Sequence, residues 1–406
     1  MDDHRRDPDA PLPAAPDPWA SSEMPSRRDG PPFHMTEMIE AEPGLAARVL
    51  QRQAAPDSSA ARLAAAVRST ASLGRPILVT GCGTSEHAAL AVVEILREAL
   101  GDAGLPSGIG QAGMPVAVQA FEASLEGELG GDGALVIGVS HEGGTWATNR
   151  ALEAAKAAGA TVALFTVSER SPGAAIADIV VATDELDQSW CHTVGYVSPM
   201  LAAAAVAGHL TDRPIQSESA RRLLGAGLAP DAVRATEALA AALNPIDHLI
   251  VSGTGVDRPA ARELVLKVEE GAHLSASMRD LETVLHGHLA GMESAMGFVL
   301  ILTDPARFDD RLARASGVLR AISTLGLSAG AIISERYDAA VPASLTPAGR
   351  LVVPSSGEIP TATASLLGSA VPLQLVTERL ARDRGVNPDP IRRDDARYLA
   401  AADAAG

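Results

Sequence analysis

Apolar residues form two kinds of pattern along the chain, short unbroken runs and longer stretches with helical spacing. A short unbroken run predicts a strand buried on both faces, whereas apolar positions at helical spacing predict an amphipathic helix. From residue 35 onward the two kinds of segment alternate. This alternation is typical of parallel sheets that are covered by helices on both faces.

The same order of elements occurs in both halves of the chain. In the first half we expect strands at 76–80, 115–119, 134–140, 161–167 and 179–181, and helices at 44–54, 59–71, 85–100, 146–158 and 197–210. In the second half we expect strands at 248–252, 297–303, 327–334 and 351–353, and helices at 258–275 and 362–383. The predicted fold class is therefore α/β, with two tandem doubly wound parallel-sheet domains of the three-layer αβα, flavodoxin-like kind.

Composition sets the expected domain boundaries. Residues 1–34 are rich in Pro, Asp, Arg and Ser and have no apolar period, so they should not bury enough surface to offset the entropy of ordering. We predict a disordered N-terminal tail there, with Met35 as an alternative start and a recruitment role left open. The remaining predictions are a first domain at 35–215, a connector at 216–245, a second domain at 246–385 and a C-terminal tail at 386–406.

The overall charge and the cysteine content narrow the class of protein. The 406 residues include 33 Lys and Arg against 50 Asp and Glu, a net charge of −17 that opposes nucleic-acid binding. Cys82 and Cys191 are too few for a disulfide framework, and the most apolar stretch, 201–208, is far shorter than the ~20 residues of a membrane span. We expect a cytoplasmic, globular protein with no nucleic-acid or membrane partner, in which local dipoles hold any anionic ligand.

Two turns that follow predicted strands carry glycines and hydroxyl side chains. The turn 81–85 reads GCGTS and offers Thr84 and Ser85, and the turn 139–145 reads VSHEGGT and offers Ser140 and Thr145. Glycine lets the backbone approach a ligand closely, and the N-terminus of the following helix favours an anion. Each turn alone is more typical of a purely structural connection. The pair points to a ligand site at the carboxyl ends of the strands, although neither turn matches a dinucleotide or nucleotide loop and no cofactor is expected.

A charged helix and a histidine pair supply further candidate chemistry. Glu263, Lys267 and Glu270 have the i, i+4, i+7 spacing that puts them on one helical face, which also fits an exposed ladder of ion pairs. His286 and His288 follow the helix, and such histidines commonly satisfy local hydrogen bonds. Because no accompanying ligand set has helix or hairpin spacing, we predict no metal site.

Together these motifs resemble the sugar isomerase (SIS) domain family, in particular the isomerase half of glucosamine-6-phosphate synthase. The resemblance runs from Met35 to about Arg392 and rests on several motifs in the family order. The family's SQSGET matches SHEGGT at 140–145, and its GRG matches GTG at 253–255. Its ALEGALKLKE matches ARELVLKVEE at 261–270, its HGPLA matches HGHLA at 286–290, and its PLQL matches PLQL at 372–375. The opening helix at 35–43 and the turn GCGTS also match.

The resemblance implies a role for each matching residue. Glu270 would be the base that moves a proton between C1 and C2 of an open-chain sugar, Lys267 a site lysine, and His286 an assistant in ring opening. In the family this histidine reaches the site of the neighbouring subunit, which implies a homodimer with a shared active site. The implied substrate-binding residues are Gly83, Thr84, Ser85, Ser140, His141, Glu142 and Thr145.

Four departures from the family pattern bear on the substrate and the reaction. Glu142 stands at a phosphate-contacting serine, beside His141 in place of a glutamine, and its carboxylate would repel a phosphate. Ala396 occupies the register of the lysine that forms a Schiff base with the ketose. The segment 186–196 (LDQSWCHTVGY) replaces VASTKAY, so that Trp190 either reshapes the sugar pocket or belongs to the core. The tail 1–34 is not expected to act as a glutaminase domain.

The leading interpretation is an enzyme of the sugar-isomerase type that acts on an amino sugar or ketose, usually as its phosphate. Its reaction would be isomerisation, or deamination or deglycation, by proton transfer between C1 and C2. Two alternatives stay open. One is a non-catalytic regulator that binds a sugar phosphate, and the other is the transferase subunit of a two-chain synthase.

Overall fold

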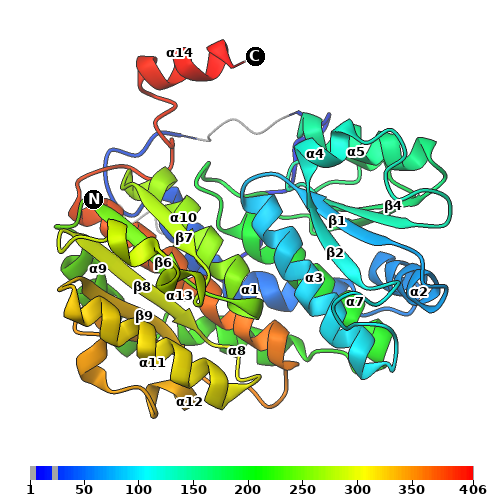
Figure 1. Ribbon diagram of the computed structural model, residues 1–406. Helices are drawn as coiled ribbons and strands as arrows, with labels where there is room; N and C mark the ends of the chain where they lie inside the picture. The colour runs from blue at the N-terminus through cyan, green and yellow to red at the C-terminus, as the bar shows by residue number, and fades with distance from the viewer. Residues whose placement is uncertain (1–5, 21–25, 406) are drawn as a thin grey trace.

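The structure is a computed structural model that describes residues 6–20 and 26–405, and its two parallel sheets lie side by side in the molecule (Figure 1). The first sheet contains β1 Ile77–Gly81, β2 Pro115–Gln119, β3 Leu135–Val139, β4 Thr161–Thr166 and β5 Ile179–Ala182. The second contains β6 His248–Ser252, β7 Ala276–Arg279, β8 Met296–Leu302, β9 Ser328–Ser334 and β10 Gly349–Val353.

Both sheets have the same strand order. The first runs β2-β1-β3-β4-β5 and the second, taken from its opposite edge, runs β7-β6-β8-β9-β10, with parallel pairing throughout. Each sheet therefore has the flavodoxin-like order 2-1-3-4-5 when its own strands are counted from one. The predicted fold class is confirmed, and so is the repetition of one unit in the two halves.

Helices cover both sheets. Those of the first half are α1 His34–Arg52, α2 Ser59–Ser72, α3 Thr84–Asp102, α4 Ala120–Leu125, α5 Trp146–Ala157, α6 Pro172–Ile176 and α7 Val194–Thr211. Those of the second half are α8 Ser217–Ala226, α9 Pro230–Leu243, α10 Arg258–Ala272, α11 Phe308–Thr324, α12 Glu335–Asp338, α13 Thr361–Asp383 and α14 Ala396–Ala404. Short 3₁₀ turns occur at Gly255–Asp257, Thr283–Leu285, His288–Gly291 and Ala343–Leu345. The residues expected to connect the domains, 216–245, thus form α8 and α9.

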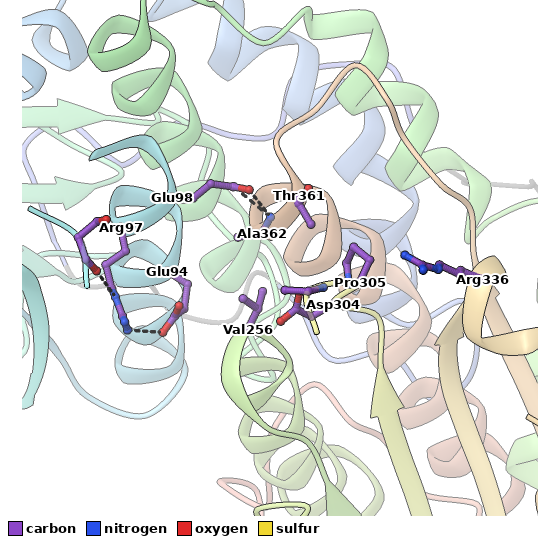
Figure 2. A pocket seen from close by; sticks show the side chains of 11 residues that line it. Glu94, Arg97, Glu98, Val256, Asp304, Pro305, Arg336, Thr361 and Ala362 are labelled. Atoms are coloured by element: carbon purple, nitrogen blue, oxygen red, sulfur yellow. Dashed lines mark hydrogen bonds and ion pairs between the residues drawn. The ribbon is translucent and has the colours of Figure 1, made fainter. Parts of the chain in front are cut away.

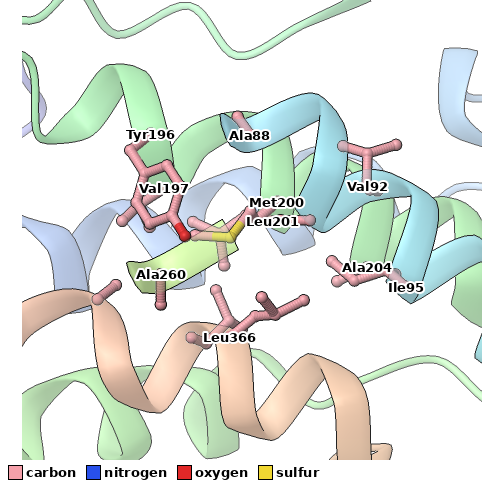
Figure 3. Packing of buried hydrophobic residues seen from close by; sticks show 14 of the residues in the cluster. Ala88, Val92, Ile95, Tyr196, Val197, Met200, Leu201, Ala204, Ala260 and Leu366 are labelled. Atoms are coloured by element: carbon pink, nitrogen blue, oxygen red, sulfur yellow. The ribbon is translucent and has the colours of Figure 1, made fainter. Parts of the chain in front are cut away.

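The core continues from one sheet to the other through a layer of helices. Val92 of α3, Met200 and Ala204 of α7, and Leu366 of α13 are buried against one another (Figure 3). Small side chains on α7 let its neighbours approach closely, and this explains why an alanine-rich stretch is buried. Among residues 6–20 and 26–405, α7 is the one helix long and apolar enough to cross a membrane by length and composition, and 89% of it is buried inside the protein.

The N-terminal segment differs from the expected disordered tail wherever the structure describes it. Leu12 is only 4% exposed, and its backbone N–H donates to Oε2 of Glu185 at 2.9 Å. The N–H of Leu186 donates to the carbonyl of Pro13 at 2.8 Å. Composition predicted that this segment cannot form a core of its own. It packs instead on the folded first domain, which supplies both the apolar surface and the hydrogen-bond partners.

The C-terminal tail is also attached to the domains up to its last helix. Both carboxylate oxygens of Asp389 accept backbone hydrogen bonds at the start of α1, from His34 at 2.9 Å and Met35 at 2.8 Å. An acidic side chain at a helix N-terminus satisfies unpaired N–H groups and the helix dipole. Beyond this anchor, α14 stands apart from the two sheets, with all of its described side chains partly or fully exposed (Figure 1).

Candidate active site

A cavity of about 640 Å³ lies at the carboxyl ends of β1 and β3. These two strands are neighbours, but the chain leaves them toward opposite edges of the sheet, which makes this crevice the topological switch point where open α/β sheets bind ligands. The cavity is lined by Trp19, Cys82, Gly83, Thr84, Ser85, His141, Glu142, Gly144, Thr145, Trp190, His192, Glu270, Ile391 and Arg393. The two turns, α10 and both tails therefore meet in one place.

The first turn, 81–85, requires its glycines. A Cβ on Gly81 would lie 2.5 Å from the carbonyl oxygen of Ser85, and Gly83 has φ +56°, a conformation that side chains disfavour. The turn leads directly into α3, which begins at Thr84. Thr84 and Ser85 consequently face the cavity at a helix N-terminus, an arrangement suited to an anion.

The second turn places its predicted residues in different environments. Thr145 and Glu142 line the cavity, whereas Ser140 is buried beneath it and its hydroxyl donates to Oγ1 of Thr145 at 3.3 Å. Gly143 has φ +66°, and a Cβ there would overlap the side chain of Ser171. Ser140 therefore contacts Thr145 from outside the cavity lining, and its direct contact with a phosphate stays a prediction.

Two histidines pack at the back of the cavity. His141 Nε2 accepts the backbone N–H of Asp187 at 2.9 Å, and its ring meets that of His192 edge-on, with 5.3 Å between centroids. Burial and then the neighbouring His192 lower the pKa of His141 to about 4. Burial and then Lys267 lower the pKa of His192 to about 4. Both imidazoles are therefore neutral near pH 7.

Glu270 enters the cavity from α10 of the second domain. Its side chain is 23% exposed, and Nζ of the fully buried Lys267 lies 2.5 Å from its Oε2. Burial raises the pKa of Glu270, and Lys267 limits the rise by stabilising the carboxylate. A base with a raised pKa that stays close to a permanent cation suits proton abstraction near neutral pH.

Lys267 itself lies behind Glu270. Burial alone would favour the neutral amine, but Glu270, Cys191 and Glu263 raise the pKa of Lys267 overall, so it is an ammonium. The same helix face continues to Glu263, which is fully buried with Oε1 at 3.6 Å from Nζ of Lys267. Glu263, Lys267 and Glu270 therefore form the predicted series of ion pairs along one helix face. The series lies in the interior, which excludes the alternative of an exposed ladder.

The network crosses to the first domain through His87 of α3. Nδ1 of His87 lies 2.7 Å from Oε2 of Glu263. Glu263 would have a raised pKa from burial alone, yet Lys267 and His87 lower it below the ordinary value. The carboxylate is therefore ionised, and it ties α10 to α3 directly beside the cavity.

The chain has sequence relatives among aminotransferases. The chain is 27% identical over 380 residues to a glutamine–fructose-6-phosphate aminotransferase (isomerizing) of Gloeobacter violaceus, a match that covers 88% of this chain and 57% of the relative. It is 25% identical over 387 residues to the protein of that name from Pyrobaculum aerophilum, covering 92% and 58%. The chain thus spans less than two thirds of the curated relatives it matches. No family model matches it.

Solved structures share the whole fold. The C-terminal domain of glucosamine-fructose-6-phosphate aminotransferase from Francisella tularensis superposes with a TM-score of 0.74 at 18% identity, covering 90% of this chain and 99% of that one. A tagatose-6-phosphate ketose/aldose isomerase assigned in Clostridium novyi gives 0.72 at 12% identity, covering 89% and 92%. The chain is thus similar in sequence to the isomerizing aminotransferases and shares its fold with these solved structures. Its sequence relatives are the isomerase parts of aminotransferases.

The two domains differ at equivalent positions. Gly253 and Asp257, at the end of β6, are four residues apart, as are Gly81 and Ser85 at the end of β1. A Cβ on Gly253 would lie 2.7 Å from the carbonyl oxygen of Asp257. The Asp257 carboxylate accepts the N–H of Thr303 at 3.0 Å, at the end of β8. The switch point of the second sheet is therefore occupied by a side chain of the protein.

A second cavity, of about 570 Å³, lies beside that occupied switch point. Figure 2 shows Glu94 and Glu98 of α3 on one side of it and Asp304 on the other. Glu98 accepts the N–H of Ala362 at 2.9 Å, which uses the N-terminus of α13. Carboxylates lie on both sides of this cavity, although Arg97 and Arg336 also line it, so the first cavity with its hydroxyl-bearing turn is the better candidate anion site.

His286 does not join the cavity of its own chain. Its side chain is 69% exposed, and Nε2 lies 2.8 Å from Oε1 of Glu282. It lies on the loop between β7 and β8. Ala396, in the register of the family's Schiff-base lysine, begins the exposed α14 and also lies outside the cavity lining.

Sequence reasoning did not assign several residues of the cavity lining to the site, and three of them come from unexpected places. Trp19 comes from the N-terminal segment, Cys82 from within the first turn, and Arg393 from the C-terminal tail, where its guanidinium carbon lies 4.5 Å from the ring centroid of Trp190. Trp190 was considered only as a residue that reshapes the pocket or belongs to the core. The glycine-flanked position of Cys82 was visible in the sequence, but no local pattern connects either tail to this site.

Proposed function

We propose that this chain is an enzyme of the sugar-isomerase type that moves a proton between C1 and C2 of an amino sugar or ketose, in most cases a phosphorylated one. The observation that carries the proposal is the position of Glu270. A carboxylate with a raised pKa faces the same cavity as the anion-suited turn 82–85. A regulator that only binds its ligand has no need for such a base.

The chemistry follows from what Glu270 contacts. Its free edge faces the cavity, where an open-chain sugar would present the C–H next to its carbonyl. The carboxylate takes that proton, the electron pair moves onto the carbonyl oxygen, and that oxygen takes a proton from solvent, which gives an enediol or, from an amino sugar, an enolamine. Return of the proton to the adjacent carbon, with loss of the proton from the hydroxyl or amine on the other carbon, completes an isomerisation. Lys267 acts through Glu270 as a positioning residue, since it is fully buried.

Phosphate would be held at the first turn. The N-terminus of α3 and the hydroxyls of Thr84 and Ser85 face the cavity, and Arg393 adds a positive charge to its lining. Aminotransferase relatives, and the fold shared with a glucosamine-6-phosphate deaminase from Thermotoga maritima (TM-score 0.59, 14% identity), support a sugar phosphate as the ligand class. Deamination by the same proton transfer is the second outcome that the test distinguishes.

Hydrogen exchange with solvent tests the reaction. The protein is incubated in deuterated water with fructose 6-phosphate, glucosamine 6-phosphate and the unphosphorylated sugars, and NMR follows deuterium at C1 and C2 while a coupled assay follows ammonia. We expect exchange with at least one sugar and a loss of about 10²-fold or more in Glu270→Gln. Glu269→Gln, on the exposed side of the same helix, is the matched control. Sugar binding without any exchange would instead establish a non-catalytic binding protein.

The proposed assembly is a homodimer with shared sites. His286 is exposed and distant from its own cavity lining, and this is what a residue donated to a second copy requires. In such a dimer the imidazole of one subunit would move a hydroxyl proton during ring opening in the other subunit's site.

Mixing two inactive variants tests this arrangement. Glu270→Gln and His286→Asn proteins are unfolded together, refolded and assayed for exchange. Random pairing should restore about a quarter of the wild-type sites, because each mixed dimer contains one site with both native residues. If His286 serves its own subunit, both sites of the mixed dimer carry a defect and the mixture stays inactive.

A further inference from the structure

Tryptophan is concentrated around one cavity. The chain has only three tryptophans, and two of them, Trp19 and Trp190, line the cavity at the first switch point. The third, Trp146, opens α5 and is 61% exposed outside that lining. Trp190 already lies against the guanidinium of Arg393, so Trp19 is the tryptophan whose role in the cavity is unexplained.

Trp19 is held in place by contacts made earlier in its segment. The backbone of Leu12 and Pro13 is hydrogen-bonded to Glu185 and Leu186, as described above. Ala15 is buried in a small cluster with Val167 and Leu186. Arg170 donates to the carbonyl of Ala15 at 3.4 Å and pairs with Asp17. The segment is thereby fixed along the loops that follow β4 and β5, two residues before Trp19.

The indole of Trp19 covers the second turn. A Cβ built on Gly144 would lie 3.4 Å from Cη2 of Trp19, which is van der Waals contact. Glu142, two residues earlier, lines the same cavity. The cavity wall at the second turn therefore includes a carboxylate and an indole, whereas the first turn presents hydroxyls and a helix N-terminus.

The parts of the cavity at the first and second turns favour different parts of a substrate. An indole offers a broad apolar face and one N–H donor, and its face attracts cations and the C–H groups of a sugar. A carboxylate beside it attracts an ammonium or hydroxyl group and repels a phosphate. The first turn has the opposite preference, because it offers donors and a favourable dipole.

We propose that Trp19 is a specificity-determining residue that stacks on the sugar over the second turn, so that the amino or hydroxyl end of an amino sugar lies beside Glu142 and its phosphate end lies at the first turn. The inference rests on the proposed sugar chemistry and sharpens it to one class of substrate. It also gives the N-terminal segment a role as a fixed wall of the site.

Calorimetric titration tests the proposal apart from turnover. Glucosamine, glucosamine 6-phosphate and fructose 6-phosphate are titrated into the full chain carrying Glu270→Gln, so that binding is measured without reaction. We expect Trp19→Ala to raise the dissociation constant of glucosamine 6-phosphate about tenfold and Trp19→Phe to raise it by less, because a smaller ring keeps part of the stacking surface. Trp146→Ala is the matched control and should bind like the parent.

Each result has a definite meaning. Unchanged affinity in Trp19→Ala, with intact folding shown by circular dichroism, would overturn the proposal, and tighter binding would show that the indole occludes the site. An equal loss for glucosamine and for fructose 6-phosphate would remove the assigned orientation. Failure of the proposed reaction would appear separately, as absent deuterium exchange in the protein with native Glu270.

Discussion

His87 of the first domain and Glu263 of the second are joined by a contact of 2.7 Å between Nδ1 and Oε2. Both side chains are buried, and they belong to α3 and α10. The helix α3 also begins with the anion-suited turn, and α10 also carries Glu270. One buried contact therefore fixes the distance between the base and the turn proposed to hold the phosphate.

Removing this contact should weaken the protein at the domain boundary. We expect His87→Ala to lower the free energy of unfolding by about 1.5–3 kcal/mol, because the buried Glu263 carboxylate loses a hydrogen-bond partner. Urea denaturation of His87→Ala, Glu263→Gln and the double variant measures the pair by a double-mutant cycle. Additive losses in that cycle would show that the two side chains stabilise the protein independently.

Replacing Lys267 should affect both stability and the pH profile. The chain has two lysines, and Lys156, on the surface, is paired with Asp178 at 3.0 Å. We expect Lys267→Met to cost about 3–5 kcal/mol, since it leaves Glu263 and Glu270 buried without their cation, while Lys156→Met should cost less than about 1 kcal/mol.

The same variant tests how Lys267 controls the base. Lys267 lowers the pKa of Glu270 against the opposing effect of burial, so its loss should raise that pKa further. Glu270 then becomes a carboxylate only at higher pH, and the acid limb of the rate profile for deuterium exchange should move upward in pH. An acid limb that stays in place in a folded Lys267→Met protein would show that another group controls it.

Asp257 should make stability depend on pH. Burial raises its pKa to about 7, although Thr303 donates to it, whereas an unfolded aspartate has a pKa of about 3.9. Between these values the folded state holds a proton that the unfolded state has lost, so this contribution to stability falls as pH rises from about 4 to about 7. Its slope is at most about 1.4 kcal/mol per pH unit.

Denaturation at a series of pH values measures this effect. The fall in stability between pH 4 and 7 should be smaller in Asp257→Asn than in the wild type, because the amide does not titrate. Asp57→Asn, at an exposed position, should leave the profile unchanged. Parallel profiles for all three proteins would show that Asp257 has an ordinary pKa.

The sequence predicted those strands well in which every residue is buried. Strands such as β3, with all five residues buried, read as unbroken apolar runs. β7 was not predicted, because its four residues, Ala276–Arg279, are each only partly buried at the sheet edge and include a serine and an arginine. α11 was also not predicted, since only four of its 17 residues are buried.

The site residues were predictable only where they lie close together in the sequence. The turn 81–85 and the spacing of Lys267 and Glu270 are contiguous motifs, and the structure brings the turn and Glu270 to one cavity. Trp19 and Arg393 belong to tails whose course depends on contacts with distant loops, such as Asp389 with α1. No periodicity or spacing in the tails themselves encodes those contacts.

Glu142 offers the sharpest test of substrate preference. Its carboxylate lines the cavity at the second turn, and a negative charge there opposes a second one on the ligand. We expect Glu142→Ser to tighten the binding of fructose 6-phosphate about tenfold, which corresponds to about 1.4 kcal/mol, and not to tighten the binding of fructose. The preference for glucosamine over fructose should disappear in the same variant, because the serine hydroxyl carries no charge to attract the ammonium group.

Calorimetry with the four sugars measures both effects. Glu153→Ser removes an exposed carboxylate from α5, outside the cavity lining, and controls for the change in net charge. If Glu142→Ser and Glu153→Ser shift the affinity for phosphorylated sugars equally, the effect is one of overall charge. A shift confined to Glu142→Ser, with opposite signs for the phosphate and the amine, means that this carboxylate selects the substrate by direct contact, since a general field falls off over about a Debye length of 10 Å at 0.1 M salt.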